Sequence, residues 1–434
     1  MADAQSGRAE STGGTLDDLM VRPGSEEYVA RVLDHLDVED WDSSGIAVSD
    51  RFREVVDLYD RDTSGTPAGF RVEKTRSPGG IVLFDLVRDI GRGPNGGLRP
   101  TPLLFSVDSA NPYEVAPCAG IVANLTCNPG IVYDLFLNDP SANRDRTFGT
   151  VDEVLAALSE VLGPGCDISV ELEDPFEEDF SRVIEEVERY EAIVGCHRLV
   201  VKVPHTGPVT RSNALMLSRD GGRLPVRYNE GGTADYLSGH NLALRLQEQG
   251  YRVNFTLMFE PHQVPLALQV RPYFINAFIR HRHAASRRFL ALIAAYEASG
   301  EVKYVEQLRE DMVLLDYLSA EDADLDLLHV LEQARAHLSL RGQLDGDGDG
   351  LDGARDSLRW LKTSNLPDTR LIICSMEDMA FPQLTKMLIE SEFESLHDRV
   401  VITTDPNYLA SWTSSPHVIS YQRRFLAAVA GGVQ

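Results

Sequence analysis

A lysine inside an apolar segment is the residue of this sequence with the clearest chemical potential. Lys202 lies in the run RLVVKVP, between Val201 and Val203. Burial among apolar side chains favours the neutral amine and lowers the pKa of a lysine. A neutral amine attacks a ketone to form an imine, which accepts the electron pair of a neighbouring C–C bond as that bond breaks. The alternative interpretation is a structural lysine that pairs with an aspartate or glutamate at the end of a strand.

Further polar residues lie inside or at the end of other apolar runs. Burying a polar group without a partner is unfavourable, so a single residue of this kind suggests a satisfied core group. Several of them in successive runs instead predict a shared site, where carboxylates near a lysine are suited to act as general acid and base. These residues are Asp108, Thr126, Asn128, Glu171, Asn254 and Thr256.

Short, nearly continuous apolar runs begin at residue 103, a pattern that is typical of parallel strands buried on both faces. Amphipathic helical patterns lie between several runs, for example from Val154 to Leu162 and from Val183 to Tyr190. Strands that alternate with helices predict an α/β fold, a (β/α)8 TIM barrel, with an open doubly wound sheet as the alternative. No G-x-G-x-x-G motif follows the first run, which argues against dinucleotide binding. The runs are 103–108, 121–126, 168–173, 198–203, 252–259, 273–279, 371–376 and 400–404.

The chain before the barrel is predicted to contain a tail and an N-terminal extension. Residues 1–14 are polar and rich in small residues, so we expect a disordered tail that is not a secretory signal. Residues 15–100 form the extension, with helical patterns from Glu27 to Leu36 and near Phe52 to Tyr59. The Gly/Pro-rich stretch 91–102 is interpreted as a linker to the barrel.

The barrel itself is predicted to occupy residues 101–434 and to carry two insertions. The connections 207–237 and 285–365 are too long for plain βα units, and the second is rich in helical patterns. Loops that follow the strands lie at the catalytic mouth of a barrel. We therefore expect these insertions to act as lids or specificity elements.

The acidic composition indicates a small-molecule partner. Asp and Glu number 67 against 41 Lys and Arg, which gives a formal net charge of -26. Such a surface repels nucleic acid and anionic membranes, and no stretch reaches the roughly 18 apolar residues of a membrane span. The five cysteines lack C-x-x-C spacing, as expected for a reduced cytoplasmic protein without disulfides or a zinc site. The sequence leaves the oligomeric state open, and a homo-oligomer is compatible with it.

Five segments between residue 103 and about residue 412 resemble the transaldolases, class I Schiff-base enzymes that have a (β/α)8 barrel. Their order and their placement in the predicted strands both agree with this family. The segments are FSVDSAN (105–111), LTCNPG (125–130), SVELEDP (169–175), VKVPHT (201–206) and VNFTLMFEPHQ (253–263).

The resemblance implies a role for each matching residue. It implies that Lys202 forms a Schiff base with a ketose donor and that a three-carbon ketol unit is transferred or cleaved, as in the pentose phosphate pathway of carbohydrate metabolism. Asp108 would move the proton of the hydroxyl at the breaking bond. Glu171, through a water held by Thr256, would shuttle protons while the imine forms and hydrolyses. No metal or other cofactor is implied.

The resemblance also implies which residues hold the substrate. Asn128 and Asn254 would bind the dihydroxyacetone-like part of the donor, with Thr126 supporting them. The sixth- and seventh-strand segments depart from the family pattern, because INAFIRHRH (275–283) and CSMED (374–378) replace its phosphate-binding residues. From these segments we assign Asn276, Ser375 and Arg280 to substrate binding, with Arg282 as the alternative to Arg280.

One replacement in these segments bears on the substrate. Glu377 occupies the position of an arginine that grips phosphate in the family. Because a carboxylate repels a phosphate dianion, we expect a non-phosphorylated, cationic or amino-bearing substrate.

Two further features are candidates for chemistry. His205 follows the lysine strand and is a candidate acid or base, although a histidine in a loop is more often part of the scaffold. The segment DGDGDGLDGARD (345–356) fits the start of a twelve-residue calcium loop, with a flexible acidic turn as the alternative. Its candidate ligands are Asp345, Asp347, Asp349 and Asp356.

Three functions are therefore considered. The leading hypothesis is a transaldolase-like transferase that acts on a ketose donor and an aldehyde acceptor. The second is a catalytically retired barrel that binds a partner, and the third is a class I aldolase, a lyase that needs no acceptor.

Overall fold

The computed structural model describes residues 20–431, apart from 42, 94–95, 196, 218, 220–221 and 345–347. The chain divides into two compact units. One comprises residues up to Pro100 together with Pro164–Cys166, and the other comprises Thr101–Gly163 and Asp167–Gln434. Among the described residues, no helix is long and apolar enough to cross a membrane.

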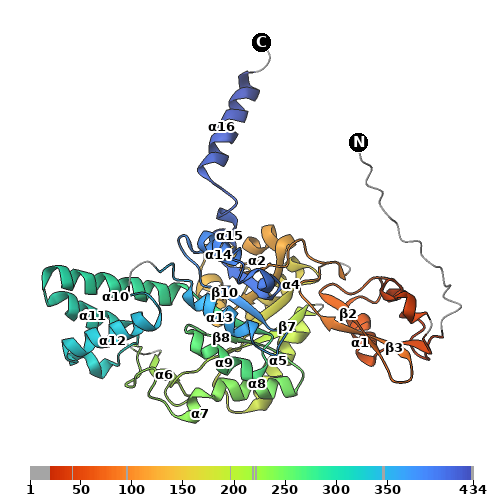
Figure 1. The fold of residues 1–434 in the computed structure, drawn as a ribbon, viewed down its shortest axis with the longest axis horizontal. Coiled ribbons are helices and arrows are strands. Elements are labelled where there is room, and N and C mark those ends of the chain that lie inside the picture. The colour runs from red at the N-terminus through yellow and green to blue at the C-terminus, as the bar shows by residue number, and fades with distance from the viewer. Residues whose placement is uncertain are drawn as a thin grey trace. The chain divides into compact units, whose positions relative to one another are not determined.

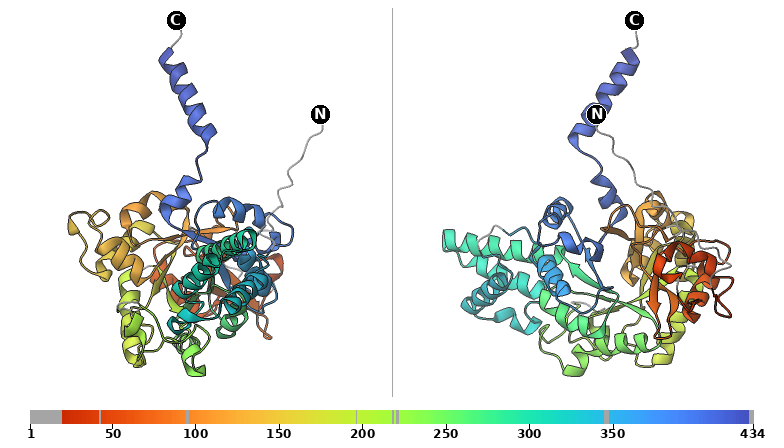
Figure 2. Two further views of the ribbon diagram at one scale, coloured as in Figure 1. Left: turned by 90° about the vertical axis from the view of Figure 1, so that its left-hand side faces the viewer. Right: turned by 45° about the vertical axis from the view of Figure 1, so that its right-hand side comes forward.

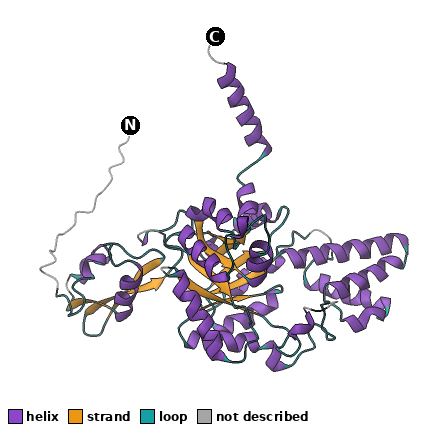
Figure 3. Ribbon diagram, turned by 180° about the vertical axis from the view of Figure 1, so that it is seen from behind, coloured by secondary structure: helices purple, strands orange, loops and turns teal. Residues whose placement is uncertain are grey.

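The second unit is a closed barrel of eight parallel strands, which confirms the predicted (β/α)8 fold (Figure 1). Its strands follow one another around the barrel in sequence order, and the last strand, β11, pairs with the first, β4, to close the ring. Figure 3 shows the strands enclosed by helices. The strands are β4 Leu104–Asp108, β5 Val122–Cys127, β6 Asp167–Glu171, β7 Arg198–Pro204, β8 Arg252–Thr256, β9 Phe274–Phe278, β10 Arg370–Cys374 and β11 Val400–Thr404.

Helices cover the outside of the barrel because their apolar stripes pack on its outward side chains. In α4, a capping box formed by Thr150 and Glu153 starts the helix, and Val154, Leu155 and Leu158 form its buried stripe. The helices of this layer and of the loops beside it are α2 Pro112–Val115, α3 Pro129–Val132, α4 Val151–Leu162, α5 Phe180–Val194, α6 Ala214–Leu217, α7 Thr233–Tyr236, α8 Ser238–Glu248, α9 Val264–Ala267, α13 Asp352–Lys362, α14 Ala380–Leu388 and α15 Pro406–Ser411. The last helix, α16 Pro416–Gly431, is exposed along its whole length.

The long connection after β9 forms a three-helix insertion (Figure 2). It consists of α10 Arg280–Ser299, α11 Lys303–Leu314 and α12 Leu327–Leu340. These helices have a core of their own, which includes Phe289, Leu308 and Val330. The helix α10 begins directly after β9, and α13 packs against β9 and β10 as a helix of the barrel layer.

The first unit is a small three-stranded sheet with one α-helix. Strand β3 Ile81–Arg88 lies between β1 Gly45–Val48, which is parallel to it, and β2 Phe70–Arg76, which is antiparallel. The helix α1 Asp50–Tyr59 confirms the predicted helical pattern in this region.

The helix predicted from Glu27 to Leu36 is wrong, because this segment forms two 3-10 turns, Val29–Arg31 and Leu33–His35. The buried side chain of Arg31 donates hydrogen bonds to the carbonyl oxygens of Gly65 and Asp60, both at 2.6 Å. These long-range contacts hold the segment in a form that its local pattern does not predict.

The inward faces of the barrel strands meet in register. Lys202 on β7 pairs with Glu171 on β6 and with Asn254 on β8. Below this level, the side chain of Asn124 donates to Ser106 Oγ at 2.8 Å and accepts from Ser169 Oγ at 3.0 Å. Because side chains alternate along a strand, this hydrogen-bonded layer fixes which residues of the next level point inward.

We expect the replacement Gly239→Ala to destabilise the barrel. Gly239 lies in the first turn of α8, and an added β-carbon there would clash with the carbonyl oxygen of Pro204 on β7. Overpacking of this kind costs about 1–3 kcal/mol of the free energy of unfolding. Urea denaturation should show the loss, with Gly120→Ala as the control because its β-carbon meets no atom within 4 Å. Equal stability of the two variants would contradict this packing.

Candidate active site

The amine of Lys202 lies inside the barrel beside a carboxylate. Its side chain is 4% exposed, and Nζ lies 3.3 Å from Glu171 Oε2. The amine also donates a hydrogen bond of 3.3 Å to the carbonyl oxygen of Cys127. The register of β6 and β7 places the lysine and the glutamate side by side at the carboxyl ends of their strands.

The prediction that Lys202 has a lowered pKa is wrong. Burial lowers the pKa of this amine, but the charges of Glu171 and Asp108 oppose burial and raise the pKa above its ordinary value. The neighbouring apolar residues on β7 indicate the burial, whereas both carboxylates come from other strands. The two carboxylates therefore favour the protonated form of the amine.

Asp108 is the second carboxyl group of the site. Burial raises its pKa to about 6, and the charge of Glu171 adds to this effect, while Lys202 and Arg280 oppose it. Its Oδ1 atom is buried and has no hydrogen-bond partner among the described residues. A carboxyl group with such a pKa changes its protonation near neutral pH, as a general acid or base must.

Several other buried polar atoms inside the barrel also have no partner within the described part of the chain. They are Nδ2 and Oδ1 of Asn254, Oδ1 of Asn276 and Oγ1 of Thr403. Buried polar atoms are nearly always hydrogen-bonded in folded proteins, so a set of unpartnered atoms on the inward faces of a barrel indicates a ligand site. Asn254 and Asn276 were predicted as site residues from the sequence, but Thr403 was not. Thr403 is also a polar residue inside an apolar strand, so the same pattern could have identified it.

Three more of the predicted polar residues lie on β5, just after β5 and on β8. Thr126 and Thr256 are buried at inward positions of β5 and β8. Asn128, just after β5, caps α3, because its Oδ1 accepts a hydrogen bond of 2.9 Å from the backbone N–H of Ile131. The amide nitrogen of Asn128 and the second lone pair of its Oδ1 remain for a substrate.

The strand ends that carry Ser375 and Arg280 are joined through the backbone. The N–H of Arg280 donates to the carbonyl oxygen of Ser375 at 2.9 Å, and the N–H of Ile279 donates to that of Cys374 at 3.1 Å. Ser375 has a φ of 57°, and Leu257, directly after β8, has a φ of 58°. Left-handed non-glycine residues at such places indicate local strain, which is concentrated at functional sites.

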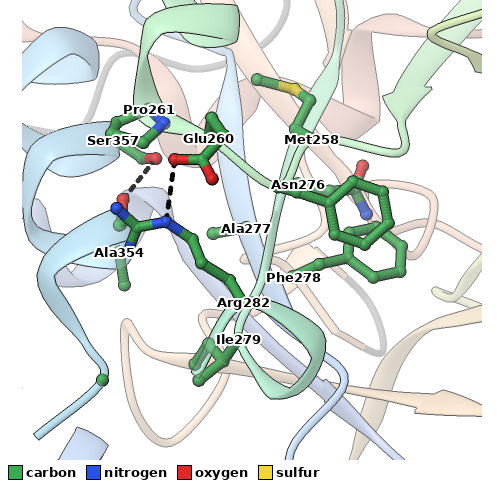
Figure 4. Close-up of a pocket in the computed structure, with 13 residues that line it drawn as sticks. Met258, Glu260, Pro261, Asn276, Ala277, Phe278, Ile279, Arg282, Ala354 and Ser357 are labelled. Carbon is green, nitrogen blue, oxygen red and sulfur yellow. Dashed lines mark hydrogen bonds and ion pairs between the residues drawn. The ribbon is translucent and has the colours of Figure 1, made fainter. Parts of the chain in front are cut away.

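The structure separates the two arginines that were considered for substrate binding. Arg282 is 6% exposed, and its Nε lies 2.9 Å from Glu260 Oε2, as Figure 4 shows. A second ion pair joins Arg282 to Asp352. Arg280 is exposed and has no carboxylate partner among the described residues, so Arg280 is the arginine that remains for a ligand.

His205 lies outside the barrel interior. Its ring packs against Phe255 of β8 and His240 of α8, with ring centroids 4.5 Å and 5.3 Å away. Burial and the neighbouring His240 and His262 lower the pKa of His205 to about 3, so the ring is neutral at physiological pH. The scaffold interpretation of His205 is therefore favoured over the catalytic one.

The candidate calcium ligands do not form a site in the described residues. Asp345 and Asp347 lie outside the described residues. Asp349 accepts two hydrogen bonds of 2.8 Å from Arg355, and Asp356 pairs with Arg359 at 2.9 Å. Within the ranges that the structure describes, no group of three or more His, Cys, Asp or Glu side chains could hold a metal ion.

Another residue near the reactive groups was not predicted from the sequence. Cys374 is buried at the carboxyl end of β10, and burial raises the pKa of its thiol, with Asp108 adding to this effect. The charge of Lys202 opposes that effect, which indicates that the thiol lies near both reactive groups. The odd cysteine count gives no signal for this placement.

Comparisons with known proteins do not assign this chain to a family. No family model matches the chain, and no curated protein sequence matches it. A solved structure described as a lactate oxidase of Pediococcus acidilactici is 10% identical, with a TM-score of 0.29. The match covers 79% of this chain and 67% of that one. A barrel with polar groups at the carboxyl ends of its strands is compatible with an enzyme, and the site's own chemistry must indicate which one.

We expect Asp108→Asn to stabilise the protein increasingly as the pH rises from 4 to 7. The folded-state pKa of Asp108 is about 6 against an ordinary value of 3.8, so its favourable contribution is complete below pH 3.8 and is lost as the pH passes 6. Because asparagine does not ionise, the variant avoids this loss. Its free energy of unfolding should rise by on the order of 3 kcal/mol relative to wild type across that range. Urea denaturation at several pH values measures the difference, and a difference that does not change with pH would contradict the raised pKa.

Proposed function

We propose that this protein catalyses Schiff-base aldol chemistry and transfers a three-carbon ketol unit from a ketose donor to an aldehyde acceptor. The observation that carries this proposal is the position of the Lys202 amine inside the barrel, 3.3 Å from Glu171 and within the electrostatic reach of Asp108. The resemblance of five strand segments to transaldolases supports the same reaction. Unpartnered amide and hydroxyl groups around the amine supply hydrogen bonds for a polyhydroxylated substrate.

The first step needs a neutral amine. Glu171 lies close enough to accept a proton from Lys202, after which both groups of the pair are neutral. The amine then adds to the ketone carbon of the donor, and Glu171 returns the proton to the oxygen that leaves as water. The product is a protonated imine, whose positive charge replaces that of the original ammonium group beside Asp108.

Asp108 serves the carbon–carbon step. Its carboxylate removes the proton of the hydroxyl next to the breaking bond, and the electron pair of that bond moves into the protonated imine to give an enamine. The first aldehyde leaves, and the enamine carbon attacks the acceptor aldehyde, whose oxygen takes the proton from Asp108. Water then hydrolyses the imine and regenerates the Lys202 amine.

Inward side chains of β8 and β9, the strands that follow the lysine strand, hold the donor. Asn254 and Asn276 point inward from β8 and β9, and both offer side-chain atoms without a protein partner among the described residues. Amides can accept from one hydroxyl and donate to another, so they can orient a ketol unit toward the amine. Thr403 on β11, which pairs in register with Ser106 of β4, adds an inward hydroxyl without a partner among the described residues.

The ion pair also favours a second candidate function, that of a retired barrel that binds a partner. A lysine held by Glu171 and kept protonated by two carboxylates is the arrangement expected of a structural lysine.

An aldolase without an obligatory acceptor uses the same steps as far as the release of the first aldehyde. Product analysis with and without an acceptor separates that reaction from transfer.

We expect borohydride to trap a ketose donor on Lys202. Reduction of the imine leaves a stable secondary amine, so mass spectrometry of digested protein should find the added mass on the peptide that contains Lys202. The variant Lys202→Ala should lose the adduct, while Lys386→Ala, which removes an exposed lysine of α14, should keep it. An intact wild-type protein that forms no adduct with fructose, fructose 6-phosphate or sedoheptulose 7-phosphate would favour the retired barrel.

We expect Asp108→Asn and Glu171→Gln to fail at different steps. Asp108→Asn should still form the trapped adduct but lower kcat about 10²–10⁴-fold, because only the carbon–carbon step needs its base. Glu171→Gln should slow adduct formation, and it should shift the pH dependence of trapping to lower pH because a charge that raises the pKa of Lys202 is removed. Loss of the adduct in both variants to the same extent would contradict the division of roles.

A further inference from the structure

A cavity lies just beyond the carboxyl ends of β9 and β10. Its volume is about 260 Å³, which is enough for a small polar group or the end of a sugar. Charged side chains of both signs line it, together with a histidine. These residues are Arg280, His283, Arg287, Asp349, Glu377 and Asp378.

The cavity lies close to the reactive groups. The charge of Arg280 lowers the pKa of Asp108, so the guanidinium is within electrostatic reach of that carboxyl group. The backbone hydrogen bond of 2.9 Å from Arg280 to Ser375 joins the two strand ends that carry the walls of the cavity. Both the cavity and Lys202 lie at the carboxyl ends of the barrel strands, the end at which (β/α)8 enzymes bind their substrates.

Most of the lining charges are already compensated. Arg287 lies 3.9 Å from Asp378, and Asp349 is held by two hydrogen bonds from Arg355. Burial and the charge of Arg287 lower the pKa of His283, which keeps its ring neutral at physiological pH. Glu377 and Arg280 are left, and neither forms an ion pair with any residue that the structure describes.

We propose that this cavity receives the protonated amino group of an amino-bearing aldehyde acceptor, with Glu377 as the residue that selects it. The proposal rests on the proposed aldol function and names the substrate class of the same site. Glu377 is the lining carboxylate without an ion-pair partner among the described residues, so it repels a phosphate dianion and attracts an ammonium group placed beside it. Arg280 donates to the hydroxyl oxygens of the same acceptor.

Matched aldoses test the proposal by both binding and turnover. The probes are glucose, glucose 6-phosphate and 6-amino-6-deoxyglucose, which differ only in the group at the end far from the aldehyde. Calorimetry measures the Kd of each probe, and kcat/KM is measured with each as the acceptor and fructose as the donor. Wild type should prefer the amino sugar over the phosphorylated one about ten-fold or more.

Two substitutions at Glu377 should reduce the preference for the amino sugar, to different extents. Glu377→Gln should weaken binding of the amino sugar about five-fold, as expected for an exposed charge, and leave glucose unchanged. Glu377→Arg should reverse the preference toward glucose 6-phosphate. The control is Glu248→Gln, because this exposed residue ends the helix before β8, at the opposite end of the barrel, and should change nothing.

The outcomes separate the two proposals. A preference of wild type for glucose 6-phosphate, or equal effects of Glu377→Gln on all three probes, would overturn the amino-group assignment even if the donor is trapped on Lys202. If the Kd values follow the predicted order but no adduct forms on Lys202, the binding site is supported and the aldol function is rejected. Failure of both measurements would overturn both proposals.

Discussion

The buried ion pair between Lys202 and Glu171 is the constraint on which the rest of the site depends. An ammonium group in a barrel interior is unfavourable unless opposite charge is close, and here two carboxylates outweigh the cost of burial. With Asp108 included, one positive and two negative charges share a small volume. The protonation of each of these three groups depends on the charges of the other two. A ligand that changes one of these charges therefore shifts protons among the remaining groups.

The barrel interior has two levels with different degrees of hydrogen bonding. In the lower level, Ser106, Asn124 and Ser169 satisfy one another across three strands. In the upper level, Asn254 and Asn276 present atoms without partners in the described chain. A satisfied layer is rigid, and it fixes the inward register of the layer above it. The lower level therefore acts as a floor that positions the groups available to a substrate.

The sequence predicts the eight barrel strands and their inward polar residues because both depend on local patterns. A polar residue in an apolar strand, such as Asn254 or Lys202, must point to a polar interior if the strand is buried on both faces. The direction of the Lys202 pKa was not predictable in this way, because Asp108 and Glu171 reach the amine from two other strands. For His205 the sequence favoured a scaffold role, and the structure agrees with it, because the ring packs on Phe255 outside the barrel interior.

The three-helix insertion contributes to the site through its attachment to the barrel. Arg341, just after α12, contacts Glu260 and donates a hydrogen bond of 2.8 Å to Tyr317, and Glu260 also binds Arg282 of α10. Buried arginines that share one carboxylate fix the rotation of α10, because breaking the cluster would leave charges without partners. Arg280 lies in the first turn of the same helix, so the cluster also positions the backbone of Arg280 beside the cavity after β9 and β10. An insertion far from Lys202 in sequence thus contributes to the geometry of the barrel mouth.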